Sequence, residues 1–312
     1  MRAGLLILYL LAPVAAFAQD THLLVIVGVG GDEEHTQKFH KWATTLIEAA
    51  RKQDGVADSN IIYLGNRPGL DPTLTSTRAN VEEAFGKLAA GVRPTDEVFI
   101  VLFGHGSFDG RKATFNLPGP DLTADDYAKL VDKLPSQRLV FVDTTSASGA
   151  FLQPLAGPGR AIVTATKTGG ERNETEFPQY FVEAFTTEAA DKNRDGRVSV
   201  AEAFEYARAK VAQMYQQKNL ILTEHAALDD GAEGGLASTM FLQSRSPAAA
   251  TADPALRPLL EERQALENQI AALRTRKTKM EPAEYDRALE KLATELALKT
   301  REIQQLEGKK KP

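Results

Sequence analysis

The stretch Glu97-Val-Phe-Ile-Val-Leu-Phe103 contains six apolar residues in succession, and Gly104-His105-Gly106-Ser107 follows it directly. A continuous apolar run of this length, closed by a glycine, is typical of a strand that is buried on both faces of a sheet. Shorter apolar runs predict four further strands, at 23–27, 60–64, 138–142 and 160–164.

Helical patterns lie between these strands. The segment Glu34–Lys52 carries an apolar stripe, Thr77–Leu88 follows Thr75 and Ser76 as candidate caps, and Thr123 with Asp126 opens another helix. Strands that alternate with helices predict an α/β fold, in which helices sandwich a mainly parallel sheet. The carboxyl ends of parallel strands share one edge, where functional residues gather.

Two strand ends bring reactive side chains to that edge. The strand at 97–103 leads into His105, and the strand at 138–142 leads into Asp143-Thr-Thr-Ser146-Ala-Ser148-Gly149. We therefore expect His105 to approach Ser146 or a neighbouring hydroxyl. Asp143 can either orient His105 or cap the turn that follows it. The glycines at 28, 30 and 31 predict a turn beside the same edge.

These motifs resemble the caspase/legumain group of cysteine peptidases (clan CD), in particular the C13, legumain-like family. In that group a His-Gly pair follows one buried strand, and the nucleophilic cysteine follows the next, three residues before a glycine. His105-Gly106 matches the first motif and Ser148-Gly149 the end of the second, so Ser146 takes the place of the cysteine. The resemblance covers roughly residues 21–185. It implies a caspase-like fold in which His105 and Ser146 form a vestigial or weak catalytic pair.

Three hypotheses follow for this edge. In the first, the domain is inactive and binds a protein or peptide, because a serine hydroxyl is far less ionised beside an imidazole than a thiol with a pKa near 8.5. In the second, Ser146 and His105 form an active hydrolase, with the Gly106 and Ser146 N–H groups as oxyanion hole. In the third, the likeness reflects only an α/β sheet with a chance His-Gly pair. The first is the hypothesis that we carry forward.

A second motif lies in the segment 191–202. Its sequence, Asp-Lys-Asn-Arg-Asp-Gly-Arg-Val-Ser-Val-Ala-Glu, matches the calcium loop of an EF-hand. The pattern assigns calcium ligands to the side chains of Asp191, Asn193, Asp195, Ser199 and Glu202, and to the backbone carbonyl of Arg197. Gly196 permits the sharp turn, and Val198 is the residue that pairs with a neighbouring loop.

The flanks of this loop also fit an EF-hand, whose helices we expect within 178–218. The incoming helix is predicted over 177–190. The alternative is an acidic surface turn between two helices. EF-hand loops usually occur in pairs, but the sequence contains only one complete loop, which favours a structural calcium site over a fast sensor.

The ends of the chain predict export and a separate helical segment. Residues 1–18 form a charged start, a short apolar run and an A-x-A site, the pattern of a secretory signal peptide. We expect the caspase-like domain over 19–243, a linker over 244–258 rich in Ala, Pro, Ser and Thr, and an α-helical hairpin over 259–307. The mature protein is then periplasmic or secreted, without a membrane span, and the hairpin joins a second copy or another partner.

Composition limits the possible partners. The chain contains no cysteine, which excludes disulfides and thiol catalysis. Residues 19–252 hold 23 basic and 31 acidic side chains, a net charge of −8 that repels nucleic acid and favours cations.

Overall fold

A computed structural model describes residues 20–52, 55–65, 74–193, 196–231, 235–242, 256–275 and 280–308. The predicted signal peptide and most of the predicted linker lie outside these ranges. Within the part of the chain that is described, no helix combines the length and the apolar character needed to cross a bilayer.

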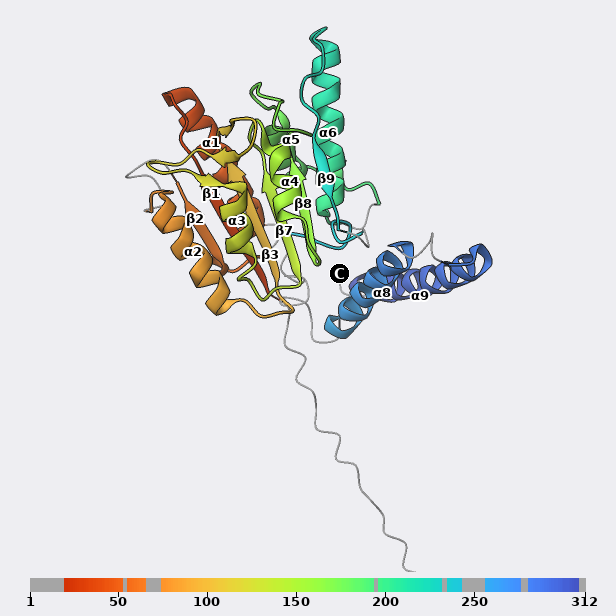
Figure 1. Cartoon of the computed structure of the whole chain (residues 1–312). Helices are drawn as coiled ribbons and strands as arrows, with labels where there is room; N and C mark the ends of the chain where they lie inside the picture. The colour runs from red at the N-terminus through yellow and green to blue at the C-terminus, as the bar shows by residue number, and fades with distance from the viewer. Residues whose placement is uncertain are drawn as a thin grey trace, which may run out of the picture.

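The described body is built on a six-stranded sheet in the order β2-β1-β3-β7-β8-β9 (Figure 1). The strands are β1 (Thr21–Val27), β2 (Ile61–Leu64), β3 (Glu97–Phe103), β7 (Arg138–Asp143), β8 (Arg160–Thr164) and β9 (Ala227–Asp229). All neighbours are parallel except β8 and β9. The predicted mainly parallel α/β sheet is therefore confirmed, whereas the antiparallel edge strand β9 was not foreseen.

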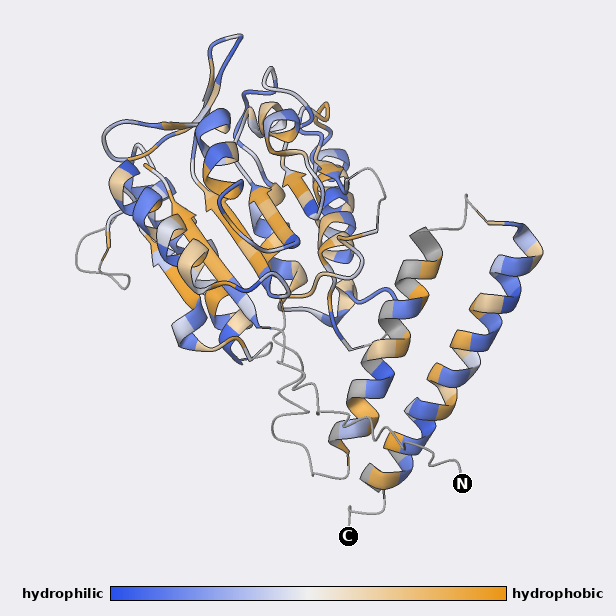
Figure 2. Cartoon of the chain, turned by 60° about the horizontal axis from the view of Figure 1, so that its bottom comes forward, coloured by the Kyte–Doolittle hydropathy of each residue, from blue (hydrophilic) through white to orange (hydrophobic). Residues whose placement is uncertain are grey.

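Helices cover both faces of this sheet. One apolar core joins it to α1 (Glu33–Lys52), α5 (Phe177–Ala184) and α6 (Val200–Gln217). The other joins it to α2 (Arg78–Gly91), α3 (Ala124–Val131) and α4 (Leu152–Leu155). The middle of each central strand is hydrophobic, as strands buried on both faces require (Figure 2).

Alternation along each strand decides which core a residue enters. In β3, Phe99, Val101 and Phe103 join the core on the α1 side, whereas Val98, Ile100 and Leu102 join the core on the α3 side. Parallel pairing sets Leu102 beside Asp143 of β7. This register decides where the candidate site residues point.

A small antiparallel sheet follows His105. It contains β4 (Gly106–Phe108), β5 (Ala113–Phe115) and β6 (Leu122–Thr123). The backbone N–H of Asn116 donates to the His105 carbonyl at 3.0 Å, which continues the β4–β5 ladder up to the histidine. Its strands are too short to give a periodic signal in the sequence, so the pattern did not predict them.

Two helix termini differ from the sequence prediction. The cap of α2 is Thr77, whose hydroxyl accepts the Asn80 N–H, while the Ser76 hydroxyl instead donates to the Val27 carbonyl. The predicted helix over 177–190 ends at Ala184. There the Phe185 N–H turns to the Val182 carbonyl, and extended Thr187 starts the separate 3₁₀ turn η3 (Glu188–Ala190).

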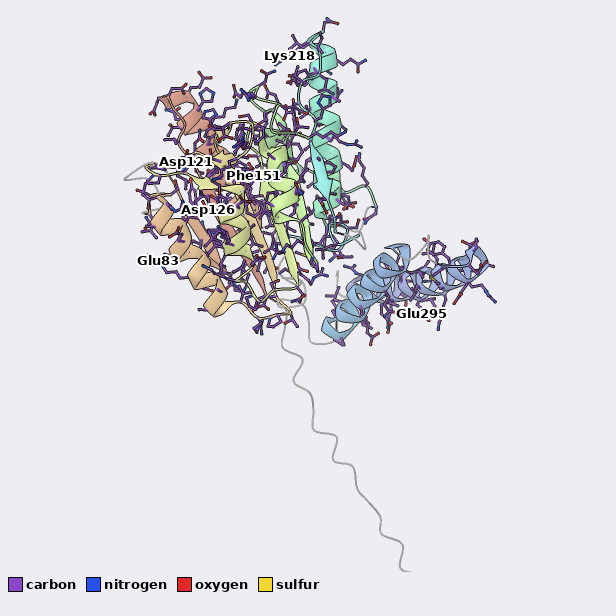
Figure 3. All side chains as sticks on the ribbon, in the orientation of Figure 1. Glu83, Asp121, Asp126, Phe151, Lys218 and Glu295 are labelled. Atoms are coloured by element: carbon purple, nitrogen blue, oxygen red, sulfur yellow. The ribbon has the colours of Figure 1, made fainter. Side chains whose placement is uncertain are left out.

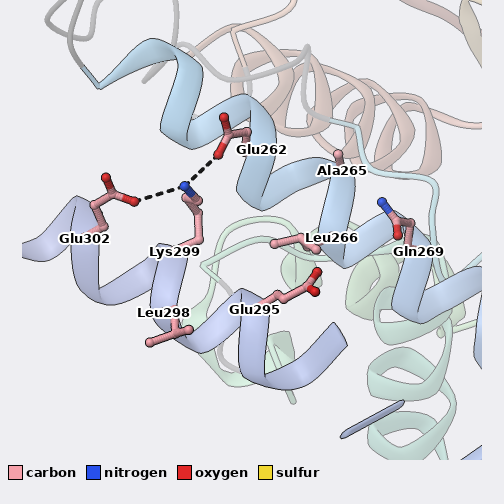
Figure 4. Close-up of a pocket in the computed structure, with 8 residues that line it drawn as sticks. All are labelled: Glu262, Ala265, Leu266, Gln269, Glu295, Leu298, Lys299 and Glu302. Carbon is pink, nitrogen blue, oxygen red and sulfur yellow. Dashed lines mark hydrogen bonds and ion pairs between the residues drawn. The ribbon is translucent and has the colours of Figure 1, made fainter. Parts of the chain in front are cut away.

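The C-terminal region contains two further helices, α8 (Arg257–Thr275) and α9 (Pro282–Gly308), which pack against each other. A groove of about 470 Å³ runs between them (Figure 4), and Leu266, Ala265 and Leu298 form its apolar part. Lys299 pairs with Glu262 at 2.6 Å and with Glu302 at 3.0 Å along the same groove.

Candidate functional site

His105 lies at the carboxyl end of β3, on the α1 side of the sheet. Its ring meets the Phe39 ring edge-on and the His35 ring at a tilt, with centroids 5.1 Å apart in both cases. Its Nε2 lies 3.0 Å from the Gly30 carbonyl oxygen. A carbonyl can only accept, so Nε2 carries the proton, and in the neutral ring Nδ1 holds the basic lone pair.

Ser146 lies at the end of the neighbouring strand, against the residue that follows His105. Its hydroxyl donates to the Gly106 carbonyl at 3.3 Å. The two backbones are so close that a Cβ on Gly106 would lie 2.4 Å from the Ser146 carbonyl oxygen. Position 106 therefore requires glycine. The structure brings His105, Gly106 and Ser146 to one edge, but no hydrogen bond between His105 and Ser146 is present among the described residues.

The Ser-Gly pair after Ser146 holds the turn in place. The Ser148 hydroxyl accepts the Thr166 N–H at 3.1 Å, and the Thr166 hydroxyl accepts the Gly149 N–H at 2.9 Å. A Cβ on Gly149 would lie 2.2 Å from the Lys167 carbonyl carbon. Both motif residues thus fasten the Ser146 turn to the end of β8. Thr166 has no motif signal in the sequence and was missed.

The loop before α5 also holds the turn in place. The Ala147 N–H donates to the Glu171 carbonyl at 2.8 Å, and the Thr175 hydroxyl donates to the Thr144 carbonyl at 2.7 Å. Ala147 itself has a left-handed backbone, with φ of +60°. A non-glycine residue in this region is uncommon and is held there by its surroundings.

Asp143 is completely buried and lies on the α3 side of the sheet, because its register partner Leu102 faces that core. One carboxylate oxygen accepts the Thr145 N–H at 3.0 Å. Burial raises the pKa of Asp143 to about 7. The carboxylate caps the turn, one of the two roles considered for it. Its location on the far face of the sheet from the His105 ring gives no support to the other role, orientation of His105.

His35 forms a second polar group beside His105 that the sequence analysis left out. Its Nδ1 lies 2.8 Å from both Asp32 carboxylate oxygens, and its Nε2 lies 3.5 Å from Glu174. These contacts, chiefly the one with Asp32, raise the pKa of His35. Glu174 also accepts from Lys38 at 2.5 Å. The only available signal was the position of His35 in the first turn of the helix that follows the Gly28–Gly31 loop.

The described residues of the segment 191–202 form a bend at Gly196 that leads into α6. Gly196 has φ of +82°, and its N–H donates to Asp191 at 2.8 Å. Glu202 lies in the first turn of α6, where its carboxylate turns back toward the loop and accepts the N–H groups of Lys192 and Asn193. The predicted ligands Asp191, Asn193, Arg197, Ser199 and Glu202 are described, whereas Asp195 lies outside the described residues.

Ser199 caps α6 in this loop. Its hydroxyl accepts the Glu202 N–H at 3.3 Å, and its own N–H donates to the Glu202 carboxylate at 3.0 Å. This reciprocal pair is a capping box. Among the described residues, no three His, Asp or Glu side chains are grouped so that they could hold a metal ion. A complete calcium shell needs the Asp195 carboxylate and the backbone and amide oxygens in addition.

Two comparisons with known proteins bear on the family of this chain. A comparison with curated proteins found no significant match. A sequence model of the Peptidase C13 family matches residues 27–226, a range that includes β2, β3, β7 and β8 and both strand ends with His105 and Ser146. The match spans more than half of the chain, and we conclude that the chain belongs to the Peptidase C13 family.

Proposed function

We propose that this chain is an exported, calcium-binding member of the C13 family that recognises a protein or peptide at the His105 edge without hydrolysing it. The single observation that carries the proposal is the hydrogen bond that Ser146 makes with Gly106. Ser146 stands where the family motif has its cysteine, and its hydroxyl donates to the Gly106 carbonyl instead of to His105. A serine becomes a nucleophile only when a base accepts its proton along an aligned hydrogen bond.

The rest of the edge is suited to holding a ligand. His105 packs against the rings of His35 and Phe39, and the Ser146 turn is hydrogen-bonded to the end of β8 and to the loop before α5. Rigid positioning of this kind lowers the entropy that binding costs. The edge carries charges of both signs, from Lys38 and Glu174, as expected of a surface that contacts polar peptide groups.

The second candidate is a Ser-His hydrolase that uses Ser146 as nucleophile and His105 as base. The observation that favours it is that His105 and Ser146 lie at one sheet edge, with Nδ1 as the basic nitrogen of the neutral ring. Its oxyanion hole is formed by the N–H groups of Gly106 and Ser146.

A fluorophosphonate probe and a panel of peptide substrates separate the two candidates. We expect neither labelling nor hydrolysis by the purified protein, and no difference between it and the Ser146→Ala variant. Labelling that disappears in Ser146→Ala, accompanied by peptide cleavage, would overturn the non-catalytic proposal in favour of the hydrolase.

Calcium belongs to the proposal as a structural ion. The residues that hold it are Asp191, Asn193, Asp195, the Arg197 carbonyl, Ser199 and Glu202. The bend at Gly196 and the inward carboxylate of Glu202 support this ligand set. Bound calcium would offset the charges of the Asp191, Asp195 and Glu202 carboxylates and fix α6 to the η3 turn that follows α5. It supplies no chemistry to the His105 edge.

The C-terminal helices supply self-association in this proposal. Leu298, in the groove of Figure 4, is 63% exposed although it is a large apolar residue. Residues 253–312 hold 13 basic and 11 acidic side chains, a net charge of only +2, so the repulsion between two copies is small. The occupant that we propose is the hairpin of a second copy. Light scattering of the unsubstituted protein and of Leu298→Glu tests this. We expect a smaller mass for the variant, and the same mass for both proteins would contradict the proposal.

A further inference from the structure

The last described segment of the body, Ala237–Leu242, lies against the second half of the calcium loop. Ser199 and Phe241 form an antiparallel bridge. The Val200 N–H donates to the Met240 carbonyl at 2.9 Å, and the Ala201 N–H donates to the Ala237 carbonyl at 3.0 Å. These amides belong to the first turn of α6, where a helix leaves its N–H groups without partners in the helix.

A side-chain contact closes the same junction. The guanidinium carbon of Arg197 lies 3.9 Å from the centroid of the Phe241 ring, within the range of a cation–π interaction. Phe241 is 9% exposed. The EF-hand pattern uses only the backbone carbonyl of Arg197, so its side chain can hold Phe241 while its carbonyl binds the ion.

The segment is also hydrogen-bonded to the amino end of the central sheet. Arg138, the first residue of β7, donates to the Thr239 carbonyl at 2.7 Å and to Glu97 of β3 at 3.0 Å. The Asp230 carboxylate accepts the Ala237 N–H at 2.7 Å. The segment therefore links the calcium loop to the amino ends of β3 and β7, at the end of the sheet away from His105.

We propose that Ala237–Leu242 takes the place of a second EF-hand loop, so that calcium binding and the docking of this segment stabilise each other. The inference rests on the proposed calcium site. It accounts for the presence of a single complete loop, because Met240 and Phe241 pair with Val200 and Ser199, directly after Val198, the position at which another loop normally pairs. The same segment is the last described part of the body before α8, so calcium fastens the chain at the point where it leaves for the C-terminal helices.

Reciprocity makes the proposal measurable. If docking raises the calcium affinity by some factor, calcium raises the equilibrium constant for docking by the same factor. Arg197→Ala and Phe241→Ala leave every proposed calcium ligand in place, because position 197 contributes only its carbonyl. Ile221→Ala is the matched control, since Ile221 is 86% exposed and belongs to the loop after α6.

The experiment combines calorimetric calcium titration with hydrogen exchange of the full-length mature protein. We expect Arg197→Ala and Phe241→Ala to weaken calcium binding by about tenfold, with the affinity of Ile221→Ala unchanged. In the unsubstituted protein, calcium should slow exchange of the Val200 and Ala201 amides. Thermal unfolding in a chelator tells a coupling effect from general destabilisation, because a coupled variant loses stability mainly when calcium is present.

The outcomes separate this inference from the calcium proposal on which it rests. If the unsubstituted protein binds calcium and both variants bind it with the same affinity, the segment is not coupled to the ion, and the inference is wrong while the calcium site stands. If the unsubstituted protein does not bind calcium, the calcium proposal fails, and the inference fails with it.

Discussion

The imidazole of His105 and the carboxylate of Asp143 lie on opposite faces of the central sheet, although their strands are neighbours. His105 packs on Phe39 of α1, whereas Asp143 follows the register of Leu102 into the α3 core. The group that receives a hydrogen bond from His105 is the Gly30 carbonyl. Asp143 therefore stabilises the Ser146 turn by accepting the Thr145 N–H, and its titration changes the stability of that turn.

Asp143→Asn tests this role through the pH dependence of stability. Burial raises the pKa of Asp143 to about 7, against 3.8 for the free residue. The folded state then binds the proton more tightly than the unfolded state, so Asp143 costs stability as the pH rises from about 4 to 7. Asparagine keeps the acceptor for the Thr145 N–H but does not titrate. We expect the free energy of unfolding to fall less over this range in Asp143→Asn, by at most roughly 4 kcal/mol.

Glu224 provides the control for that measurement. Burial also raises the pKa of Glu224 to about 7, although its carboxylate accepts the N–H groups of Glu176 and Phe177 at the start of α5. Its contribution has the same sign and remains in Asp143→Asn. Chemical denaturation of the unsubstituted protein and of the variant between pH 4 and 8 yields the difference. Parallel curves for the two proteins would show that Asp143 does not titrate in this range.

Two glycine substitutions test how closely the His105 and Ser146 strands approach each other. A Cβ at Gly106 would lie 2.4 Å from both the Ser146 carbonyl and the Thr145 hydroxyl. We expect Gly106→Ala to destabilise the fold by about 1–3 kcal/mol, because the backbone of the Ser146 turn must move. In α2, a Cβ at Gly86 meets no atom within 4 Å, so Gly86→Ala should stabilise by about 0.5–1 kcal/mol. Thermal unfolding of both variants checks the contrast, and equal effects would refute it.

The sequence predicted the sheet well because its central strands are buried on both faces and read as continuous apolar runs. The edge strand β9 has only partly buried residues and shows no such run. Asp143 illustrates a different limit. The sequence shows that it lies at the end of a strand, near His105, but the face of the sheet on which its side chain lies follows from the strand register. The helix before the calcium loop was predicted too long because Thr186 and Thr187 do not interrupt the apolar pattern, although Thr187 is extended in the structure.

Within the site, the motifs identified the residues but not their contacts. His105, Gly106 and Ser146 are at one edge, as expected. The packing of His35 on His105 and the bonds of Thr166 to Ser148 and Gly149 depend on loops that are far apart in sequence. No periodicity or spacing encodes such contacts, so they needed the three-dimensional structure.

A thiol introduced at position 146 tests whether His105 can act on the side chain of that residue. In Ser146→Cys the new cysteine is the only one in the chain. We expect its pKa to lie below the usual ~8.5, because the imidazole of His105 at the same edge can accept the thiol proton. The rate of alkylation by iodoacetamide as a function of pH gives this pKa. The matched protein is Ser146→Cys with His105→Ala, where the pKa should return toward the usual value. The same pKa in both proteins would indicate that His105 does not reach position 146.

Glu202→Gln tests the calcium loop without removing the helix cap. Glutamine at the third position of α6 can still accept the Ser199 N–H in the capping box, so the loss of α6 stability is small. It cannot supply the charged, two-oxygen ligand that closes an EF-hand loop. We therefore expect calorimetric titration to show calcium binding by the unsubstituted protein and a loss of at least about tenfold in affinity for Glu202→Gln. Glu205→Gln, one turn further along α6 and outside the loop pattern, is the control and should bind normally. Equal affinities for all three proteins would mean that the acidic loop is a surface turn, the alternative that the sequence left open.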